Sequence, residues 1–279
     1  MILSGKARLA GVLGWPVGHS RSPRLHGYWL KKLAIDGAYL PLPVKPEDFA
    51  LVLRALPRMG FAGANVTVPH KETAMALVDH LDPLAKRIGA VNTLVVRADG
   101  GIEGHNTDAF GFLENLRQDC PVFHPDHAPA VVLGAGGAAR AVVAALTEAG
   151  TPQIRLLNRH RERAERLAAE LGGAITVIDW ERREAALEGI GLLVNTTSLG
   201  MTGQPPLDLD LAALPGDALV NDIVYAPMVT DLLRHAGDRG NPVVGGLGML
   251  LHQARAGFAA WFGVMPEVTA DLRKFVEGE

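Results

Sequence analysis

The sequence predicts an α/β protein of two domains, in which helices pack on β-sheets. Three observations lead to this prediction. Apolar strand-like segments alternate with helical segments from end to end, the alternation breaks near Asp99-Gly100-Gly101, and a second series of six strands begins at Ala130. The length of 279 residues fits one large domain or two modest ones.

The first half alternates strands with helices, which predicts parallel strands joined by crossover helices. Its expected strands are Arg8–Leu13, Ala38–Pro43, Gly63–Val68 and Asn92–Arg97. Its expected helices are Pro23–Leu33, Pro46–Met59, His70–Val78 and Pro83–Ile88. A proline suits the first turn of a helix because the missing N–H is not needed there, which supports the starts at Pro23 and Pro46.

The second half begins with a helix over Asp108–Arg117 and a loop from Cys120 to Pro129 that contains three prolines. Its expected strands are Ala130–Leu133, Gln153–Asn158, Ala174–Ile178, Leu192–Asn195, Ala218–Asp222 and Pro242–Val244. A helix over Arg161–Leu171 carries one apolar stripe and stops at Gly172. Six strands separated by helices match a doubly wound sheet, and a long apolar helix over Leu247–Phe262 follows it.

Composition excludes several classes of protein. The 27 basic and 30 acidic side chains nearly balance, so we expect no binding to nucleic acid or to an anionic membrane. Lys6 and Arg8 interrupt the apolar N-terminal stretch, which makes it a poor secretory signal. The longest uncharged run, Gly189–Leu207, holds too many polar residues and prolines to span a membrane. We therefore expect a cytoplasmic protein.

Cysteine and histidine patterns give no reason to expect a metal. The single cysteine, Cys120, excludes a disulfide within the chain and a Cys-rich zinc site. Cys120, His124 and His127 are close in the proline-containing loop, but they lack a second pair of ligands at zinc spacing. The prediction is that the chain binds no metal.

A glycine motif after the first strand of the second half predicts a nucleotide site. Gly134-Ala135-Gly136-Gly137-Ala138-Ala139 has the form G-x-G-x-x-A, follows a strand and opens a helix. Gly134 permits the tight turn, Gly136 lets a pyrophosphate approach the backbone, and Ala139 lets the helix pack closely on the strand. The helix N-terminus adds oriented N–H groups and a positive dipole end.

The next strand indicates which dinucleotide binds. An NAD site usually has Asp or Glu at the end of this strand to bind the ribose 2′-OH. Here the strand ends in Asn158-Arg159, with no carboxylate. A guanidinium can bind a 2′-phosphate with two hydrogen bonds and stack on adenine, so Arg159 favours NADP, whereas Arg163 belongs to a solvated helix start.

The first half places polar residues near the ends of predicted elements. Ser20 and Ser22 precede the helix at Pro23, where they either cap that helix or bind a carboxylate. Asn65 and Thr67 lie two residues apart in a strand and point the same way. Lys71 stands in the first turn of a helix, where the dipole disfavours it, and Asp108 is the candidate carboxylate that holds it.

These motifs together resemble the shikimate dehydrogenase family over nearly the whole chain. The similarity rests on eight short segments in the family's order: Gly18–Pro23, Asn65–Lys71, Gly89–Thr93, Asn106–Asp108, Gly134–Ala138, Asn195–Thr197, Tyr225–Pro227 and Gly246–Gln253. The resemblance implies an NADP-dependent, reversible reduction of 3-dehydroshikimate to shikimate in aromatic amino-acid biosynthesis.

The resemblance also implies an architecture. It consists of an N-terminal α/β substrate domain over residues 1–107 plus 246–279, to which the C-terminal helix returns, and a Rossmann-like NADP-binding domain over residues 108–245.

The resemblance also assigns roles to residues. Lys71 and Asp108 would be the catalytic pair, and both would contact the substrate. The other substrate contacts it implies are Ser20 and Ser22 to the carboxylate, with Asn65, Thr67, Asn92, Gln253 and Tyr225 elsewhere on the ligand. The cofactor contacts it implies are Gly134, Ala135, Gly136, Gly137 and Ala138 at the pyrophosphate, Asn158, Arg159 and Arg161 at the adenosine end, and Thr196, Ile223 and Gly246 at the nicotinamide.

Two positions depart from the family pattern, and three other functions compete. Many relatives have an acidic residue where this chain has Pro83, and an aromatic or aliphatic residue where it has His70. The rivals are a quinate/shikimate dehydrogenase that uses NAD or NADP, a nonenzymatic NADP-sensing regulator, and a methylenetetrahydrofolate dehydrogenase. The expected partner is a small-molecule substrate, and the expected state is a monomer or a homodimer.

Overall fold

The chain forms two compact units in this computed structural model, which describes residues 2–278. The first unit contains the residues up to Asp108 together with those from Leu250 onward, and the second is Ala109–Met249. The ranges expected from the sequence place Asp108 in the second domain and residues 246–249 in the first. The structure places Asp108 in the first unit and residues 246–249 in the second. Within residues 2–278, no helix combines the length and the apolar character that a membrane crossing needs.

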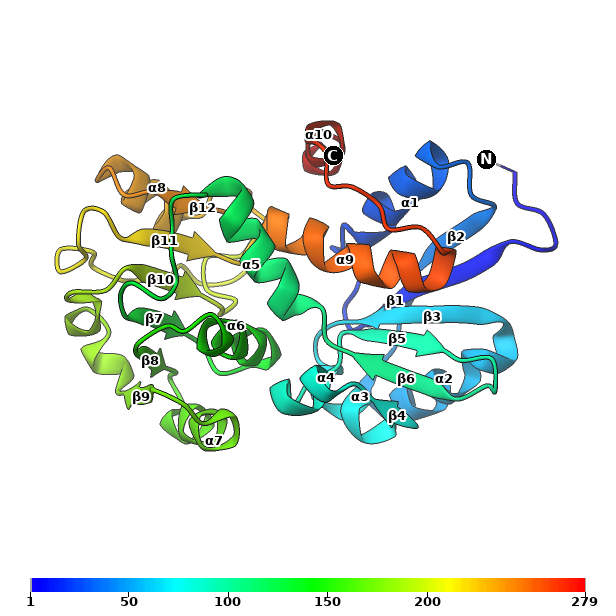
Figure 1. The fold of residues 1–279 in the computed structure, drawn as a ribbon, viewed down its shortest axis with the longest axis horizontal. Helices are drawn as coiled ribbons and strands as arrows, with labels where there is room; N and C mark the ends of the chain where they lie inside the picture. The colour runs from blue at the N-terminus through cyan, green and yellow to red at the C-terminus, as the bar shows by residue number, and fades with distance from the viewer. Residues whose placement is uncertain (1, 279) are drawn as a thin grey trace. The chain divides into compact units, whose positions relative to one another are not determined.

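The first unit is built on a mixed six-stranded sheet (Figure 1). Its strands are β1 (Arg8–Gly14), β2 (Gly37–Pro43), β3 (Phe61–Val66), β4 (His80–Leu81), β5 (Thr93–Val96) and β6 (Ile102–His105). They lie in the order β2-β1-β3-β5-β6-β4. Strands β2, β1 and β3 are parallel, as are β4 and β6, but β5 runs antiparallel to both of its neighbours.

The expectation of an all-parallel first sheet is therefore wrong at β5, and β4 and β6 are strands that the sequence did not predict. The supposed break at Asp99-Gly100-Gly101 is the turn of a β5–β6 hairpin. Gly100 has φ of 84°, and its N–H donates to the Arg97 carbonyl at 3.0 Å. A glycine takes this left-handed conformation without strain, so the chain reverses here and leaves no room for a crossover helix.

Helices cover both faces of this sheet. They are α1 (Ser22–Lys32), α2 (Phe49–Ala55), α3 (Lys71–Leu77), α4 (Pro83–Ile88), α9 (Leu247–Phe262) and α10 (Ala270–Glu277). The helix predicted over Pro46–Met59 is instead α2 between two short 3₁₀ helices, η1 (Pro46–Asp48) and η2 (Pro57–Met59). Pro57 has no N–H to continue the α-helical pattern, which explains the change at that point.

The two faces of the sheet pack different cores. On one face, α2, α3 and α4 bury an aliphatic cluster that includes Leu53, Ala74 and Ala85. On the other face, aromatic rings from α1, β2 and α9 pack together, and the ring of His26 stacks on Tyr39 at 3.9 Å. Trp261 of α9 donates its indole N–H to the Leu94 carbonyl at 2.9 Å, which ties the C-terminal helix to this sheet as predicted.

The second unit is built on a six-stranded parallel sheet in the predicted doubly wound order. Its strands are β7 (Ala130–Leu133), β8 (Ile154–Leu157), β9 (Ile175–Ile178), β10 (Leu192–Asn195), β11 (Leu219–Asp222) and β12 (Val243–Val244), in the order β12-β11-β10-β7-β8-β9. The order reverses between β7 and β10, and ligands bind at such switch points, outside the carboxyl ends of the strands.

Helices and 3₁₀ turns complete the second unit. They are α5 (Asp108–Asp119), α6 (Gly137–Glu148), α7 (Arg161–Leu171) and α8 (Asp231–Asp238), with η3 (Trp180–Arg182) and η4 (Ala185–Leu187). Alternate residues of β7 explain the layers, because Val131 and Leu133 pack into a core with η4 and α8. Ala130 and Val132 face the other side of the sheet, and all four β7 residues are buried.

Replacement of His26 by Phe should reduce the fall in the free energy of unfolding that occurs at acid pH. The His26 ring is fully buried, neither of its nitrogens has a partner among the described residues, and burial lowers its pKa from 6.5 to about 3. The unfolded chain binds this proton below pH 6.5 and the folded chain does not, so stability falls as the pH drops from 6.5 towards 3. At pH 5 the loss is about 2 kcal/mol.

The measurement is urea unfolding of wild type and His26→Phe at pH 7.5 and pH 5. The difference in unfolding free energy between the two proteins should shift in favour of His26→Phe at the lower pH. The same difference at both values would show that His26 does not resist protonation in the folded state.

Candidate functional site

A lysine–carboxylate pair occupies the first unit where two helices begin. Lys71 is the first residue of α3 and Asp108 is the first residue of α5. The Lys71 Nζ donates to Asp108 Oδ2 at 2.5 Å, and the two side chains are 17% and 7% exposed. The partial positive charge at the start of α3 disfavours an ammonium, so the adjacent carboxylate supplies the compensating interaction.

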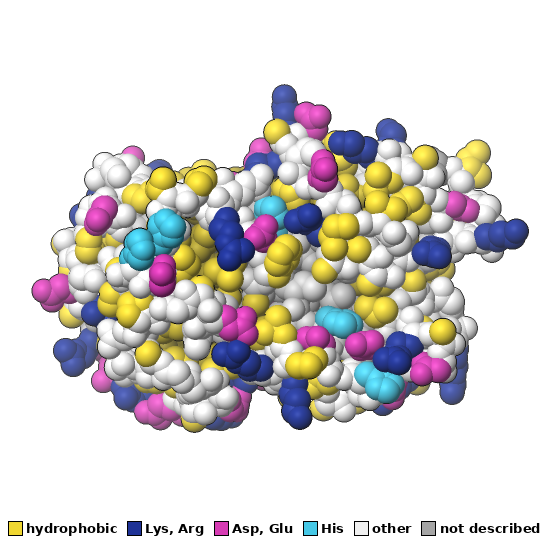
Figure 2. All heavy atoms as spheres, in the orientation of Figure 1, with side chains coloured by type: hydrophobic (Ala, Val, Ile, Leu, Met, Phe, Trp, Pro, Cys, Tyr) yellow, Lys and Arg dark blue, Asp and Glu magenta, His cyan; other side chains and the backbone are white. Residues whose placement is uncertain are grey.

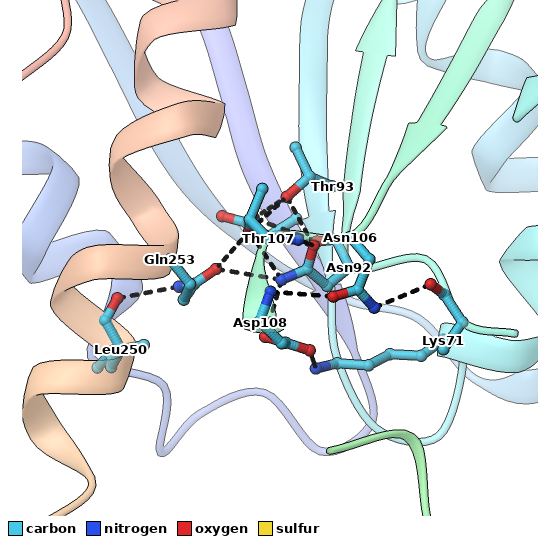
Figure 3. Close-up of polar contacts among 10 residues, drawn as sticks. Lys71, Asn92, Thr93, Asn106, Thr107, Asp108, Leu250 and Gln253 are labelled. Carbon is cyan, nitrogen blue, oxygen red and sulfur yellow. Dashed lines mark hydrogen bonds and ion pairs between the residues drawn. The ribbon is translucent and has the colours of Figure 1, made fainter. Parts of the chain in front are cut away.

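Asn92 fixes the other oxygen of this carboxylate. Its Nδ2 donates to Asp108 Oδ1 at 2.8 Å, while its own Oδ1 accepts from the Thr107 N–H at 2.9 Å. The Asp108 N–H donates in turn to Asn106 Oδ1 at 3.0 Å. Both carboxylate oxygens are therefore engaged, and Asp108 holds the Lys71 ammonium in one place (Figure 3).

Gln253 of α9 and Asn65 of β3 join the same polar cluster. Gln253 Oε1 accepts from Asn92 Nδ2 at 3.3 Å, and its Nε2 donates to the Leu250 carbonyl at 3.0 Å (Figure 3). Asn65 Nδ2 donates to the Asn92 carbonyl at 3.2 Å and to Thr93 Oγ1 at 3.1 Å. The structure thus brings together five of the predicted residues, namely Asn65, Lys71, Asn92, Asp108 and Gln253.

The two serines lie at the start of α1, and Ser22 reaches the cluster through a tyrosine. Ser20 Oγ accepts from the Ser22 N–H at 3.3 Å, while the N-cap of α1 is Arg21 and has no side-chain cap hydrogen bond. The Ser22 side chain hydrogen-bonds to the hydroxyl of Tyr39, which donates to Asn65 Oδ1 at 2.6 Å. Burial raises the pKa of Tyr39 well above its usual value, so this hydroxyl stays neutral and can donate and accept.

Thr67 follows β3 directly and packs against β1. Its N–H donates to the Leu13 carbonyl at 2.9 Å, and its methyl group occupies the space that a side chain at position 14 would need. Gly14 is therefore required at that position by the close approach of Thr67. His70, before Lys71, stacks on Phe49 at 4.2 Å and lies 2.8 Å from the Val44 carbonyl through its Nε2.

The glycine turn of the second unit joins β7 to α6. Gly134 has φ of 111°, and a Cβ there would lie 2.6 Å from Thr196 Oγ1, so only glycine fits. A Cβ on Gly136 would meet nothing within 4 Å, so this backbone faces open space. Gly136 is the N-cap of α6 without a side-chain cap, which leaves N–H groups of the first turn available to an anion. These features fit a bound pyrophosphate.

The residues predicted to bind the adenosine end of the cofactor lie after β8, and they differ in whether their side chains already have partners. Asn158 Nδ2 donates to the His160 carbonyl at 2.9 Å and shapes the turn. Arg159 is exposed and forms no ion pair with any residue among 2–278, so its guanidinium is available to a phosphate. Arg161 already pairs with Asp179 at 2.5 Å and Glu165 at 2.8 Å. The Arg161–Asp179 pair borders a cavity of about 590 Å³.

The predicted nicotinamide residues lie near the carboxyl ends of β10 and β11. Thr196 Oγ1 donates to the Leu133 carbonyl at 2.6 Å. A Cβ on Gly246 would collide with the backbone of Ile223, so the two segments touch directly. Two buried amides fix the chain before Gly246, because Asn221 donates to the Val244 carbonyl and Asn115 donates to the Gly245 carbonyl, both at 2.8 Å. Tyr225 lies in this unit, two residues beyond Ile223.

Asp222, at the end of β11, is a buried carboxylate outside the predicted set. It accepts hydrogen bonds from Asn195 Nδ2 at 3.0 Å, from the Val224 N–H at 3.0 Å and from the Thr230 hydroxyl at 2.7 Å. Burial raises its pKa above the usual carboxyl value. These bonds fix the loop that begins at Ile223, after the end of β11.

Sequence reasoning missed several residues that support the site, Asp222 among them. Thr107 lies within the Asn106–Asp108 motif, and its position next to Asp108 could have identified it as part of the site. Tyr39 and Asn221 are polar residues within largely apolar strands, whereas Asn115 is a fully buried residue of α5, a helix that carries several charged side chains. Such a residue is buried only with a hydrogen-bond partner, but the sequence does not identify that partner.

Three family models match successive parts of the chain. They are the shikimate dehydrogenase substrate binding domain over residues 12–94, shikimate / quinate 5-dehydrogenase over residues 121–200, and the shikimate 5′-dehydrogenase C-terminal domain over residues 246–273. The first match lies within the first unit, the second lies within the second unit, and the third crosses the boundary between Met249 and Leu250.

Individual relatives agree with these matches. The shikimate dehydrogenase (NADP(+)) of Paramagnetospirillum magneticum is 72% identical over 274 residues, which cover 98% of this chain and 99% of that protein. The shikimate 5-dehydrogenase of Thermus thermophilus in complex with NADP(H) and shikimate has a TM-score of 0.86 at 37% identity, covering 96% of this chain and 98% of that one.

A third relative has the same fold but is named for a different substrate and is bound to NAD. The quinate dehydrogenase of Corynebacterium glutamicum in complex with NAD has a TM-score of 0.89 at 30% identity, covering 96% of this chain and 98% of that one. Identity over nearly the full length and the three matching models agree, and the chain belongs to the shikimate dehydrogenase family.

Proposed function

We propose that this protein catalyses the reversible, NADPH-dependent reduction of 3-dehydroshikimate to shikimate, a step of aromatic amino-acid biosynthesis. The observation that carries the proposal is the Lys71–Asp108 pair inside a cluster of amide and hydroxyl side chains. A ketone reduction needs one group that supplies a proton to the new alkoxide, and a fixed ammonium is suited to that task.

Lys71 is the proton donor in this proposal. NADPH, when bound, supplies the hydride that reduces the carbonyl carbon. The Lys71 ammonium hydrogen-bonds the carbonyl oxygen, offsets its developing negative charge and transfers a proton to it. Asp108 accepts one N–H from Lys71, and among residues 2–278 no other side chain accepts from this ammonium. The remaining N–H groups are therefore available to a substrate oxygen.

In the reverse direction the same nitrogen acts as the base. A neutral Lys71 amine takes the hydroxyl proton of shikimate, and Asp108 stabilises the ammonium that forms. Asn92 keeps the Asp108 carboxylate in place throughout, because its amide N–H remains bonded to Oδ1.

The surrounding cluster supplies groups for a hydroxylated ring carboxylate. Asn65, Thr67, Asn92 and Gln253 offer amide and hydroxyl groups for the ring hydroxyls, and Ser20 and Ser22 stand at the start of α1, where an anion is favoured. Tyr225 is proposed as a further substrate contact. A site built to hydrogen-bond hydroxyl groups discriminates strongly against analogues that lack them.

The second unit binds NADP in this proposal. The glycine turn from Gly134 to Ala138 and the uncapped start of α6 hold the pyrophosphate, while Thr196, Ile223 and Gly246 contact the nicotinamide. Asn158 and Arg159 hold the 2′-phosphate end. Arg161 is proposed as a second contact, which requires its guanidinium to exchange Asp179 for the phosphate.

A quinate or dual quinate/shikimate activity is the second candidate. A quinate dehydrogenase bound to NAD is among the structural relatives. The free guanidinium of Arg159 at the end of β8, where an NAD site has a carboxylate, favours the NADP-linked reaction.

We further propose that the protein acts in the cytoplasm, as a monomer or homodimer.

The direct test mixes the purified protein with NADPH and 3-dehydroshikimate and follows the loss of NADPH absorbance. The expected result is rapid oxidation that depends on both compounds. The values of kcat/KM for shikimate and for quinate, each with NADP and with NAD, should be highest for shikimate with NADP. Greater efficiency with quinate and NAD would establish the second candidate.

Replacement of Lys71 by Ala should lower kcat by about 10²- to 10⁴-fold, because the proton donor is lost, while KM changes little. The control is Lys86→Ala, which removes an exposed lysine from α4 and should leave kcat unchanged. Single-turnover measurements with NADPH separate the chemical step from product release. A Lys71→Ala protein with a near-normal chemical rate would remove Lys71 from the mechanism.

Replacement of Arg159 by Ala should raise KM for NADPH by about 10- to 100-fold, since charge-assisted hydrogen bonds to the 2′-phosphate are worth about 1.5–3 kcal/mol. The much weaker use of NADH should stay the same, because NADH lacks that phosphate. Arg161→Ala should have a smaller effect. Arg166→Ala, which removes an exposed charge from α7, is the matched control. Equal losses with both nucleotides would contradict the assignment of Arg159.

A further inference from the structure

A cluster of two histidines and one aspartate lies on the loop between α5 and β7. His124, Asp126 and His127 each offer one ligand atom, and these atoms lie within 4.8 Å of one another. All three residues are exposed. Figure 2 shows that histidine and acidic side chains lie on the surface of the molecule.

Backbone and ring contacts hold the loop that carries these residues. The Phe123 N–H donates to the Cys120 carbonyl at 3.0 Å, and the His127 N–H donates to the His124 carbonyl at 3.3 Å. The two imidazole rings stack with centroids 4.7 Å apart and planes 26° from parallel. Three prolines between Cys120 and Ala130 restrict the backbone further. The free chain therefore already presents both rings on the same side of one turn.

The chemistry of these groups selects the class of ion. Two imidazole nitrogens and one carboxylate oxygen suit Zn²⁺ and its neighbours in the first transition series better than Ca²⁺ or Mg²⁺, which prefer oxygen ligands alone. Around a tetrahedral Zn²⁺, with bonds of about 2.1 Å, donor atoms lie roughly 3.4 Å apart. Small side-chain rotations can close the cluster from its present spacing, because the Asp126 and His127 side chains are 58% and 70% exposed.

We propose that His124, Asp126 and His127 form a surface site for one divalent transition-metal ion of the Zn²⁺ or Ni²⁺ type. The protein supplies three ligands, and water completes the coordination. Three exposed ligands give an affinity in the micromolar range rather than that of a closed structural site. Asp126, between the two histidines in sequence, is the ligand that a search for cysteine-based zinc spacing overlooks, and this proposal replaces the prediction that the chain binds no metal.

The site is separate from the nucleotide site of the same unit. The loop ends where β7 begins, at Ala130, whereas the glycine turn follows the other end of β7, after Leu133. Four strand residues span about 13 Å, so the metal site and the glycine turn lie beyond opposite ends of β7. Metal binding and NADP binding are therefore expected to be independent of each other.

The test is isothermal titration calorimetry of ZnCl₂, and separately NiCl₂, into the full, untagged protein after treatment with chelator. We expect one equivalent of metal per chain with a micromolar Kd. His124→Ala and His127→Ala should each weaken binding at least tenfold, and Asp126→Asn should weaken it by a smaller factor.

Three controls test the location of the site. His235→Ala removes an exposed histidine of α8 and should leave the titration unchanged, as should Cys120→Ala, which removes the buried thiol of the same loop. Saturating NADP should also leave it unchanged. No binding up to millimolar metal, or equal binding by wild type and both histidine variants, would overturn the proposal.

Discussion

The ion pair between Lys71 and Asp108 is the constraint on which the site depends. An ammonium at the start of α3 is opposed by the dipole of its own helix, and it is only 17% exposed. A carboxylate at the start of α5 is favoured by the dipole of that helix. The two helix ends therefore act in opposite senses on the two charges, and the pair forms where the favoured anion can offset the disfavoured cation. Asn92 makes the arrangement rigid, because it fixes the oxygen that Lys71 leaves unused.

The polar cluster around Asn92 is assembled from segments that are far apart in the chain. Asn65, Asn92 and Gln253 come from β3, the segment before β5, and α9, and their amides are joined by hydrogen bonds within one unit. Gln253 reaches the cluster only because the chain returns to the first unit after the second is complete. The Trp261 indole, bonded to the Leu94 carbonyl, fixes the returning helix to the same sheet. Packing of α9 therefore contributes directly to the geometry of the site.

The features that the sequence predicted well are those set by local chemistry. The glycine turn, the strand before it and the helix after it form one continuous motif, and the ends of β7, β10 and α7 match the predicted ends. The β5–β6 hairpin was missed because its turn resembles a domain break, and its direction is decided by pairing with β3. Tyr39 was missed for a related reason. Its hydroxyl gains a role only through Asn65 and Ser22, which are distant in sequence.

In the second unit, two buried amides fix the backbone just before Gly246. Asn115 and Asn221 each use the amide nitrogen to hold the chain just before Gly246, and each leaves a buried side-chain oxygen without a partner among the described residues. A buried unsatisfied acceptor costs about 1–3 kcal/mol, and an apolar residue would not avoid that cost, because it would leave the Val244 or Gly245 carbonyl without its amide donor. The two amides fix the 244–246 turn against Ile223, where the close backbone contact requires glycine. The same two amides therefore pair the carbonyls of this turn and hold the backbone where the proposed nicotinamide contact needs it fixed.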